Sequence, residues 1–302
     1  MAEIDVVKRG LMPSPQLIVV DACTRDGRGG SPTAVVLDDA TRTDDERRAV
    51  AATVGTSHTA FVDSSSAVPP RVRFFTAEGE LRNCGHGTIA AQAVLLHGAG
   101  GTQHHGYQRT GNRTVAVTAT RRRDGIEVWF EQGVIALRDR TERASSAIIA
   151  ALGLTPGDVA TDDLRVASPG TPRLLVRVQD RRALSAMRPD FVRLAAECRR
   201  LGYLGCFAYA LSPSTGPVTA RMFAPAIGVD EDIVNANSAG CLAAHLLDTS
   251  RTSQIEVHQG DTLGRPSSVF ATATHTRDGI VARLGGLVHH PEAPPRVVRR
   301  RV

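Results

Sequence analysis

Lysine is almost absent from this 302-residue chain: of its 36 lysines and arginines, only Lys8 is a lysine. A pyridoxal-phosphate enzyme needs a lysine for its Schiff base, and Lys8 lies near a terminus, where chains fray. A Walker loop needs Gly-Lys-Ser/Thr, which does not occur. No GxGxxG opens a helix after a strand. The sequence therefore predicts a protein that uses no cofactor of these kinds.

Paired cysteines and long apolar runs are also missing. The five cysteines are an odd number without a Cys-x-x-Cys pair, so we expect no disulfide framework and a cytoplasmic protein. No apolar run approaches the roughly 18 residues of a membrane-spanning helix, and the polar first ten residues predict no signal peptide. A composition of 42% hydrophobic and 22% charged residues is typical of a globular protein with one large or two ordinary domains.

The positive charge is carried by arginine, with clusters at 121–123 and 299–301. Neither cluster has interleaved aromatic residues, which nucleic-acid sites often use for stacking. We interpret both clusters as solvated surface charge. Neither nucleic acid nor a membrane is an expected partner.

Each half of the chain contains a helix that is apolar on every side, over 87–97 and 238–247. Such a helix must be enclosed, and a curled sheet could enclose it. The other predicted helices are 43–53, 144–152 and 190–201, and the predicted strands are 17–22, 33–37, 59–62, 71–75, 114–120, 125–131, 164–166, 173–178, 206–210, 218–223, 253–258, 267–273 and 279–287.

Two short polar stretches, residues 83–88 and 232–240, each lead into one of these apolar helices. The N-terminus of a helix presents N–H groups without helical partners and the positive end of the helix dipole. Two such ends that face one another would hold a carboxylate between acid–base side chains. This arrangement predicts a site that moves a proton on a small acid.

Several motifs in collinear order over roughly 270 residues carry a family resemblance: 20–23, 29–36, 57–62, 71–76, 80–81, 84–88, 221–225, 231–232, 259–260 and 263–267. The chain resembles the PhzF-like isomerases of phenazine biosynthesis, within the diaminopimelate epimerase superfamily. The resemblance implies an α+β fold of two similar domains, each a curved, mostly antiparallel sheet or barrel around a central helix. It also implies an active site in the interdomain cleft, no cofactor and a homodimer. We expect domains over 13–131 and 132–290, and a mobile basic tail over 291–302.

The resemblance carries over to the site residue by residue. The family histidine is kept as His86, and the acidic residue of its Glu-Asp-Pro segment is kept as Asp232. The usual catalytic glutamate is replaced by His58. The Thr-Gly-Ser turn is replaced by Asn235-Ala236-Asn237. Cysteine-dependent epimerases in the superfamily use two facing thiols; Cys84 lies at the first position, but Asn235 occupies the second.

We therefore take His58, Cys84, His86 and Asp232 as the candidate catalytic residues. A histidine at position 58 can replace a glutamate as base, and a helix N-terminus would keep His86 neutral and lower the pKa of Cys84. The alternative for each residue is a packing, capping or hydrogen-bonding role. The candidate substrate-binding residues are Gly85, Gly87, Thr88, Asn235, Asn237 and Ser238.

We expect no metal, because Cys84 and His86 are closer in sequence than the usual ligand pairs and no fourth ligand is evident. The favoured function is a cofactor-independent isomerase that shifts a proton and a double bond in a small unsaturated or cyclic amino acid. By resemblance, the substrate is a 4-substituted pyrroline carboxylate of antibiotic biosynthesis. A Cys84-dependent epimerase or racemase with Asp232 as second base, and a non-catalytic protein that binds a small acid, remain as alternatives.

Overall fold

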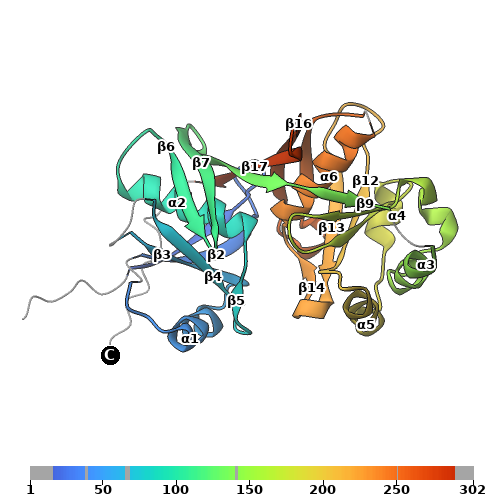
Figure 1. Cartoon of the computed structure of the whole chain (residues 1–302), viewed down its shortest axis with the longest axis horizontal. Coiled ribbons are helices and arrows are strands. Elements are labelled where there is room, and N and C mark those ends of the chain that lie inside the picture. The colour runs from blue at the N-terminus through green and yellow to red at the C-terminus, as the bar shows by residue number, and fades with distance from the viewer. Residues whose placement is uncertain (1–15, 38–39, 65–68, 140–141, 250, 290–302) are drawn as a thin grey trace, which may run out of the picture.

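Two lobes lie side by side and are joined by strands that run between them (Figure 1). The structure, a computed structural model, describes residues 16–37, 40–64, 69–139, 142–249 and 251–289. The expected basic tail, 291–302, and the first residues of the expected N-terminal domain, 13–15, lie outside these ranges.

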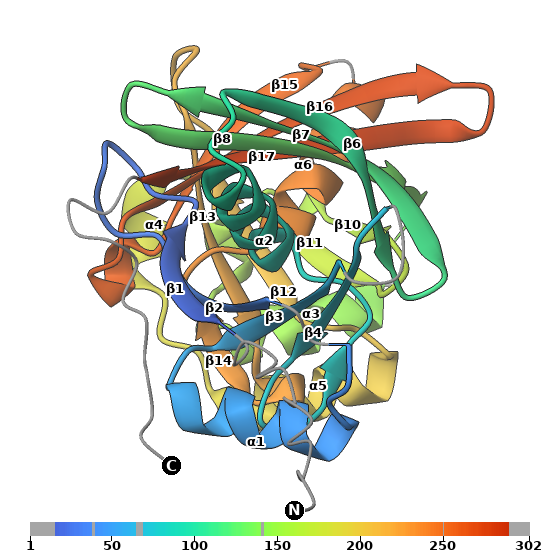
Figure 2. The ribbon, with the colours of Figure 1, turned by 90° about the vertical axis from the view of Figure 1, so that its left-hand side faces the viewer.

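The N-terminal lobe surrounds helix α2, whose side chains are almost all buried. The helix contacts strands on several sides of the lobe, and Figure 2 shows it between two layers of strands. A second helix, α1, begins with a capping box at Thr43 and Glu46 and lies outside the sheet. The elements are β1 (Leu17–Ala22), β2 (Ser31–Leu37), α1 (Asp44–Val54), β3 (His58–Asp63), β4 (Arg71–Phe75), β5 (Glu80–Leu81), α2 (Gly85–Gly98), β6 (Gln103–Thr110), β7 (Arg113–Arg122) and β8 (Gly125–Val134).

The C-terminal lobe encloses helix α6 in the same way, while α3, α4 and α5 cover a second apolar core on the outside of its sheet. The elements are β9 (Ala136–Arg138), α3 (Glu142–Ala151), β10 (Arg165–Ser168), β11 (Arg173–Arg177), α4 (Arg181–Ala186), α5 (Phe191–Leu201), β12 (Cys206–Ala210), β13 (Val218–Ala224), β14 (Val229–Asp232), α6 (Ala236–Asp248), β15 (Gln254–Gln259), β16 (Ser267–Thr276) and β17 (Gly279–His289). Short 3-10 turns occur at Pro156–Asp158, Thr161–Asp163, Pro225–Ile227 and Asp261–Leu263.

Strands β8 and β17 join the two lobes. They pair with each other from Gly125 to Val134, while β8 also pairs with β7 and β17 also pairs with β16. The register of this pairing shifts at one point. On β17 the adjacent residues Ala282 and Arg283 pair with Gly133 and Glu131 of β8, so Gln132 between them has no partner in the ladder. This bulge turns the side chain of Gln132 toward the junction of the lobes, as bulges beside functional sites often do.

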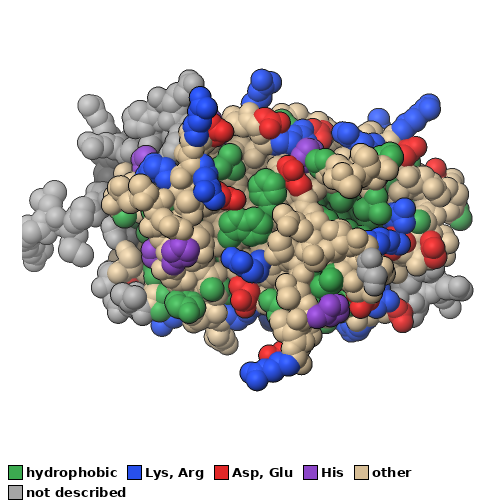
Figure 3. Space-filling view, turned by 90° about the horizontal axis from the view of Figure 1, so that it is seen from above, with side chains coloured by type: hydrophobic (Ala, Val, Ile, Leu, Met, Phe, Trp, Pro, Cys, Tyr) green, Lys and Arg blue, Asp and Glu red, His purple; other side chains and the backbone are tan. Residues whose placement is uncertain are grey.

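An aromatic cluster lies on the outer face of this shared sheet. Trp129 alternates with buried Val128 and Phe130, so its ring points away from the core. The ring stacks on Phe270 at a centroid distance of 6.2 Å. It also covers Gly285, where a Cβ would lie 2.5 Å from the indole. Figure 3 looks onto this side of the molecule and shows hydrophobic side chains near its middle, among charged ones.

The expected α+β fold, with a mostly antiparallel sheet around a helix in each half, is confirmed. Among the described residues, no helix is both long and apolar enough to cross a bilayer. The two central helices begin two residues before the predicted starts, because Cys84 and Asn235 cap them with their side chains. Several short or polar elements were not predicted: β5, β6, β9, β14 and α4.

Candidate active site

The N-termini of α2 and α6 meet where the two lobes touch. A Cβ on Gly85 would lie 2.7 Å from the Cβ of Ala236 and 3.5 Å from the backbone nitrogen of Asn237. The side-chain nitrogen of Asn237 donates a hydrogen bond to the side-chain oxygen of Asn83 at 2.9 Å. The two polar stretches that the sequence singled out therefore face one another, and only glycine fits at position 85.

Helix α2 begins with a sulfur cap. The Cys84 Sγ accepts a hydrogen bond from the Gly87 N–H at 3.3 Å, and the Thr88 hydroxyl donates to the Cys84 carbonyl at 2.9 Å. Gly87 is also spatially required, since a Cβ there would lie 2.8 Å from the Phe74 ring and 3.0 Å from Cys84 Sγ. Of the predicted binding residues, Gly87 and Thr88 therefore shape the turn that carries Cys84 and His86.

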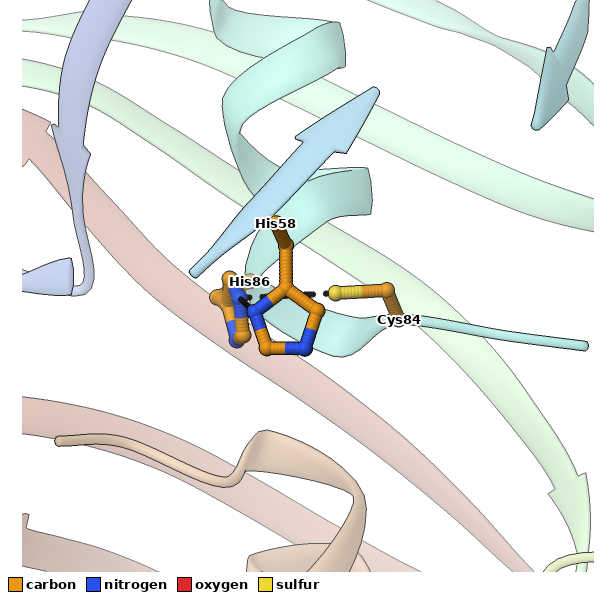
Figure 4. A group of neighbouring side chains, drawn as sticks. All are labelled: His58, Cys84 and His86. Atoms are coloured by element: carbon orange, nitrogen blue, oxygen red, sulfur yellow. Dashed lines mark hydrogen bonds between the residues drawn. The ribbon is translucent and has the colours of Figure 1, made fainter. Parts of the chain in front are cut away.

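Three candidate catalytic side chains converge at this turn (Figure 4). His58 arrives from the first residue of β3, and its Nδ1 lies 2.9 Å from the Nε2 of His86. The same His86 nitrogen lies 3.5 Å from Cys84 Sγ. All three residues are at most 7% exposed. The sequence analysis named all three as candidate catalytic residues, and the fold brings His58 to the other two from 26 residues upstream of Cys84.

The hydrogen bonds indicate the tautomer of each ring. His86 is hydrogen-bonded to the backbone of Val234 in the other lobe, and its Nε2 already faces Cys84 and His58, so the proton that it shares with the Val234 carbonyl is on Nδ1. Nε2 is then an acceptor, and the Nδ1 of His58, which also lies 2.9 Å from the Ser57 hydroxyl oxygen, is its donor. The Nε2 of His58 is left with its lone pair. Figure 4 shows this nitrogen pointing away from His86 and Cys84.

Burial sets the charge of this cluster. Desolvation, with the neighbouring His86, lowers the pKa of His58 from 6.5 to about 3. Desolvation also lowers the pKa of His86 to about 4, in agreement with the expected neutral ring. The prediction for Cys84 was wrong: burial raises its pKa to about 12, against the lowering effect of the Gly87 N–H. At neutral pH the cluster is therefore uncharged, with His58 as its available base.

Asp232 faces this cluster from the last residue of β14 and is 8% exposed. Burial raises the pKa of its carboxyl group, against the nearby His58 and hydrogen bonds from Asn235 and the Val234 N–H. The Asn235 Nδ2 donates to its Oδ2 at 3.0 Å. The raised pKa makes this carboxylate a stronger base than an ordinary aspartate, as is common for carboxyl groups in acid–base sites.

Arg173 is a site residue that the sequence did not reveal, because an arginine in a predicted strand reads as surface charge. It is 1% exposed and its Nη1 donates to the Ser238 hydroxyl at 2.9 Å and to the Asn235 Oδ1 at 3.4 Å. Asn235 Oδ1 also accepts from the Ser238 N–H at 2.9 Å. These bonds fix the orientation of Asn235 and so place its amino group on Asp232.

Gln132 is the second residue that was missed, and no sequence signal marks a bulge. Its Nε2 donates to the backbone carbonyl of Asn237 at 3.0 Å and to the Asn237 Oδ1 at 3.2 Å. The side chain therefore ties the joining strand β8 to the first turn of α6. Its Oε1 is buried and accepts no hydrogen bond from any residue that the structure describes.

The cavity beside the two helix ends is small, about 40 Å³. Its wall includes Asn83, Cys84, Thr88, Gln132 and Asn237. Such a volume holds water but not an amino acid. The two lobes are therefore in contact here in this structure.

Comparison with known proteins gives the family of the chain. The family model described as "Phenazine biosynthesis-like protein" matches residues 20–284. The chain is 32% identical over 270 residues to the uncharacterized isomerase YddE of Salmonella typhimurium, covering 86% of this chain and 90% of that protein. It is 30% identical over 260 residues to the trans-2,3-dihydro-3-hydroxyanthranilate isomerase of Pseudomonas aeruginosa, covering 85% and 89%.

Solved structures share the fold. A PhzF-family phenazine biosynthesis protein of Bacillus anthracis superposes with a TM-score of 0.78 at 20% identity, covering 92% of this chain and 97% of that one. A hydroxyproline epimerase of Agrobacterium vitis, solved with bound trans-4-hydroxy-L-proline, superposes with a TM-score of 0.59 at 12% identity, covering 92% and 91%.

Proposed function

This chain belongs to the phenazine biosynthesis-like family and is an isomerase, and we propose that it moves a proton, and with it a double bond, in a small unsaturated or cyclic amino acid without a cofactor. The observation that carries the proposal is the His86–His58 hydrogen bond, which leaves one buried, neutral imidazole nitrogen available as a base. The substrate carboxylate lies between the first-turn N–H groups of α2 and α6, where the helix dipoles favour an anion.

His58 Nε2 takes a proton from the substrate carbon, and the resulting imidazolium keeps its Nδ1 proton on His86. The electron pair left on that carbon moves the double bond along the substrate. The proton returns to a different carbon either directly from the His58 imidazolium or by way of Asp232, which first takes it from His58; the raised pKa of Asp232 favours that uptake. The negative charge of Asp232 when ionised also stabilises the imidazolium.

Burial makes His58 a weak base in the free enzyme. It can take a proton from the substrate only if the imidazolium that forms is stabilised when the substrate is bound. The substrate carboxylate and Asp232 both bring negative charge to this position. We therefore assign the three groups distinct roles: His58 moves the proton, His86 holds His58 in the reactive tautomer, and Asp232 stabilises and completes the transfer.

The test is solvent exchange in deuterated water. His58→Ala should lose incorporation of deuterium into substrate and product by at least about 100-fold, the range expected for removal of a general base. His275→Ala, which changes an exposed histidine on β16, is the matched control and should keep the wild-type rate. If His58→Ala incorporates deuterium at the wild-type rate, His58 is not the base.

As the substrate we propose a five-membered ring, a 4-substituted pyrroline carboxylate of an antibiotic pathway. Support comes from the bound hydroxyproline of the Agrobacterium vitis structure, a ring of that size in the same fold, and from the carboxylate-binding helix ends. A panel of pyrroline carboxylates and dihydroanthranilates, incubated with the enzyme in deuterated water, separates the two ring classes. Exchange on the six-membered acids alone would contradict this assignment.

The alternative of a Cys84-dependent epimerase is less well supported, because a thiol whose pKa is raised to about 12 is not a thiolate at neutral pH. Alkylation of Cys84 decides between them: full activity afterwards excludes the thiol mechanism. The non-catalytic alternative predicts tight binding of a small acid without exchange at any of its carbon atoms.

The outer aromatic cluster supports a further proposal, that the enzyme is a homodimer through this sheet face. Trp129 on β8 and Phe270 on β16 are half-buried and stack on one another on the outer face of the sheet, and aromatic residues are enriched in interfaces. Trp129→Glu should shift the mass in light scattering from dimer to monomer. Val192→Glu, at an 83% exposed position on α5, should not. A monomeric wild-type protein would refute the proposal.

A further inference from the structure

The side chains of His58, Cys84 and His86 form a set of metal ligands as well as an acid–base cluster. Their ligand atoms, two ring nitrogens and one sulfur, all lie within 4.8 Å of one another. The expectation of no metal rested on the short sequence spacing of Cys84 and His86 and on the lack of a fourth ligand. The fold answers the first ground, because it brings the His58 side chain on β3 next to this pair. Among the described residues, the group still has three protein ligands.

Two of the three separations between ligand atoms are close to those around a tetrahedral ion. Zinc–nitrogen bonds of about 2.0–2.1 Å and zinc–sulfur bonds of about 2.3 Å place a nitrogen and a sulfur ligand about 3.5 Å apart, and the Cys84 Sγ to His86 Nε2 distance is 3.5 Å. The same geometry separates two nitrogens by about 3.3 Å. The rings of His58 and His86, with 2.9 Å between their facing nitrogens, need to move apart by only about 0.4 Å.

The surroundings also fit a metal. His86 is held by the Val234 backbone, the kind of outer contact that orients a metal-binding imidazole. The Gly87 N–H points at Cys84 Sγ and would stabilise its thiolate. A small cavity lined in part by Cys84 adjoins the cluster.

We infer that His58 Nδ1, Cys84 Sγ and His86 Nε2 bind a thiophilic metal ion such as Zn²⁺ in the absence of substrate. On binding, the Cys84 S–H bond breaks, its proton goes to solvent and the sulfur lone pair forms the bond to the metal. His58 gives its Nδ1 lone pair to the metal, and its ring proton is then on Nε2. Nothing is oxidised or reduced.

This tautomer change has a consequence that rests on the proposed function. The nitrogen that would act as base carries a proton once the metal is bound, so the metal inhibits the isomerase and a chelator restores it. Metal binding itself does not depend on the proposed reaction, and the two claims can be tested separately.

The binding test uses the full-length protein, freed of metal with a chelator and titrated with Co²⁺ and then Zn²⁺. Wild-type protein should take up one Co²⁺ per chain, with a thiolate-to-cobalt charge-transfer band that Zn²⁺ abolishes. Cys84→Ser keeps a helix-capping side chain but should lose the band, and His58→Gln should bind at least about 100-fold more weakly.

Two controls separate this site from others in the chain. Cys198→Ser removes a thiol that is hydrogen-bonded to Cys206, and His275→Gln removes an exposed imidazole; both should bind as wild type. A band that persists in Cys84→Ser, or wild-type uptake no greater than that of Cys84→Ser, overturns the inference. If Zn²⁺ binds as described but solvent exchange continues at the uninhibited rate, the role of His58 as base fails while the metal site stands.

Discussion

Asn237 donates a hydrogen bond to Asn83 across the junction of the two lobes, at a distance of 2.9 Å. The bond is partly exposed, and its loss should cost about 0.5–1.5 kcal/mol. Asn83→Ala should therefore shift the lobes toward separation by up to about tenfold. Hydrogen exchange at the first-turn amides of α6 measures the shift. Asn112→Ala, in an exposed turn, is the control, and equal protection in both variants would show that the bond does not hold the lobes together.

The contact between Gly85 and Ala236 predicts a compensating pair of substitutions. Gly85→Ala puts a methyl group 2.7 Å from the Ala236 Cβ, an overpacking that should cost about 1–3 kcal/mol or force the lobes apart. Ala236→Gly in the same chain removes the opposing methyl group and should recover most of the loss. Denaturant unfolding of the four proteins gives the coupling. Additive effects would mean that the two residues are not in contact in solution.

The depressed pKa values of His58 and His86 predict loss of stability in acid. Both groups bind a proton more weakly in the folded chain, with a pKa of about 3 and about 4, than in the unfolded chain, near 6.5. Their contribution is complete above pH 6.5 and decreases as the pH falls toward the folded values, by up to about 1.4 kcal/mol per pH unit for each group. Urea unfolding between pH 7 and 4 measures how the free energy of unfolding changes with pH. This free energy should fall less steeply toward low pH in His58→Gln than in His275→Gln. The same dependence on pH in both variants would mean that the pKa of His58 is not lowered in the folded protein.

Arg173 predicts a separation of activity from stability. Among the described residues no carboxylate forms an ion pair with it, so Arg173→Met should leave stability unchanged or raise it. Asn235 would lose its fixed orientation, and kcat should fall by about 10- to 100-fold. Arg177→Met removes a partner of buried Asp163 and should instead lower stability with little effect on kcat. A wild-type kcat for Arg173→Met would show that Arg173 is not needed to orient Asn235 for catalysis.

Local patterns in the sequence were sufficient for the central helices and most strands, because an all-apolar helix and an alternating strand each leave a periodic signal. The strand β6 left none: Gln103–Thr110 is polar along most of its length and lies largely exposed on the sheet. The early starts of α2 and α6 were missed because capping depends on side-chain geometry, as with Cys84 Sγ and the Gly87 N–H.

The grouping of site residues could be predicted where they are close in sequence. It could not be predicted where tertiary packing determines which residues are in contact. Cys84 and His86 share one turn, and Asp232 and Asn235 another, so their grouping followed from spacing. That His58 would lie 2.9 Å from His86 depends on how β3 packs against α2. The direction of the Cys84 pKa shift depends on burial, which outweighs the helix N-terminus and cannot be judged from a single chain segment.

The pairing of β8 with β17 joins the two halves of the molecule by backbone hydrogen bonds as well as by the chain itself. These bonds do not depend on an intact peptide chain between the halves. If the polypeptide were divided after Arg138, the first fragment would keep β8 and the second would keep β17, whose paired edges run from Gly125 to Val134. Each fragment would carry an incomplete barrel with an exposed strand edge that only the other fragment matches. The enzyme is thus suited to reassembly from two separately produced pieces, with recovered catalysis reporting their reunion.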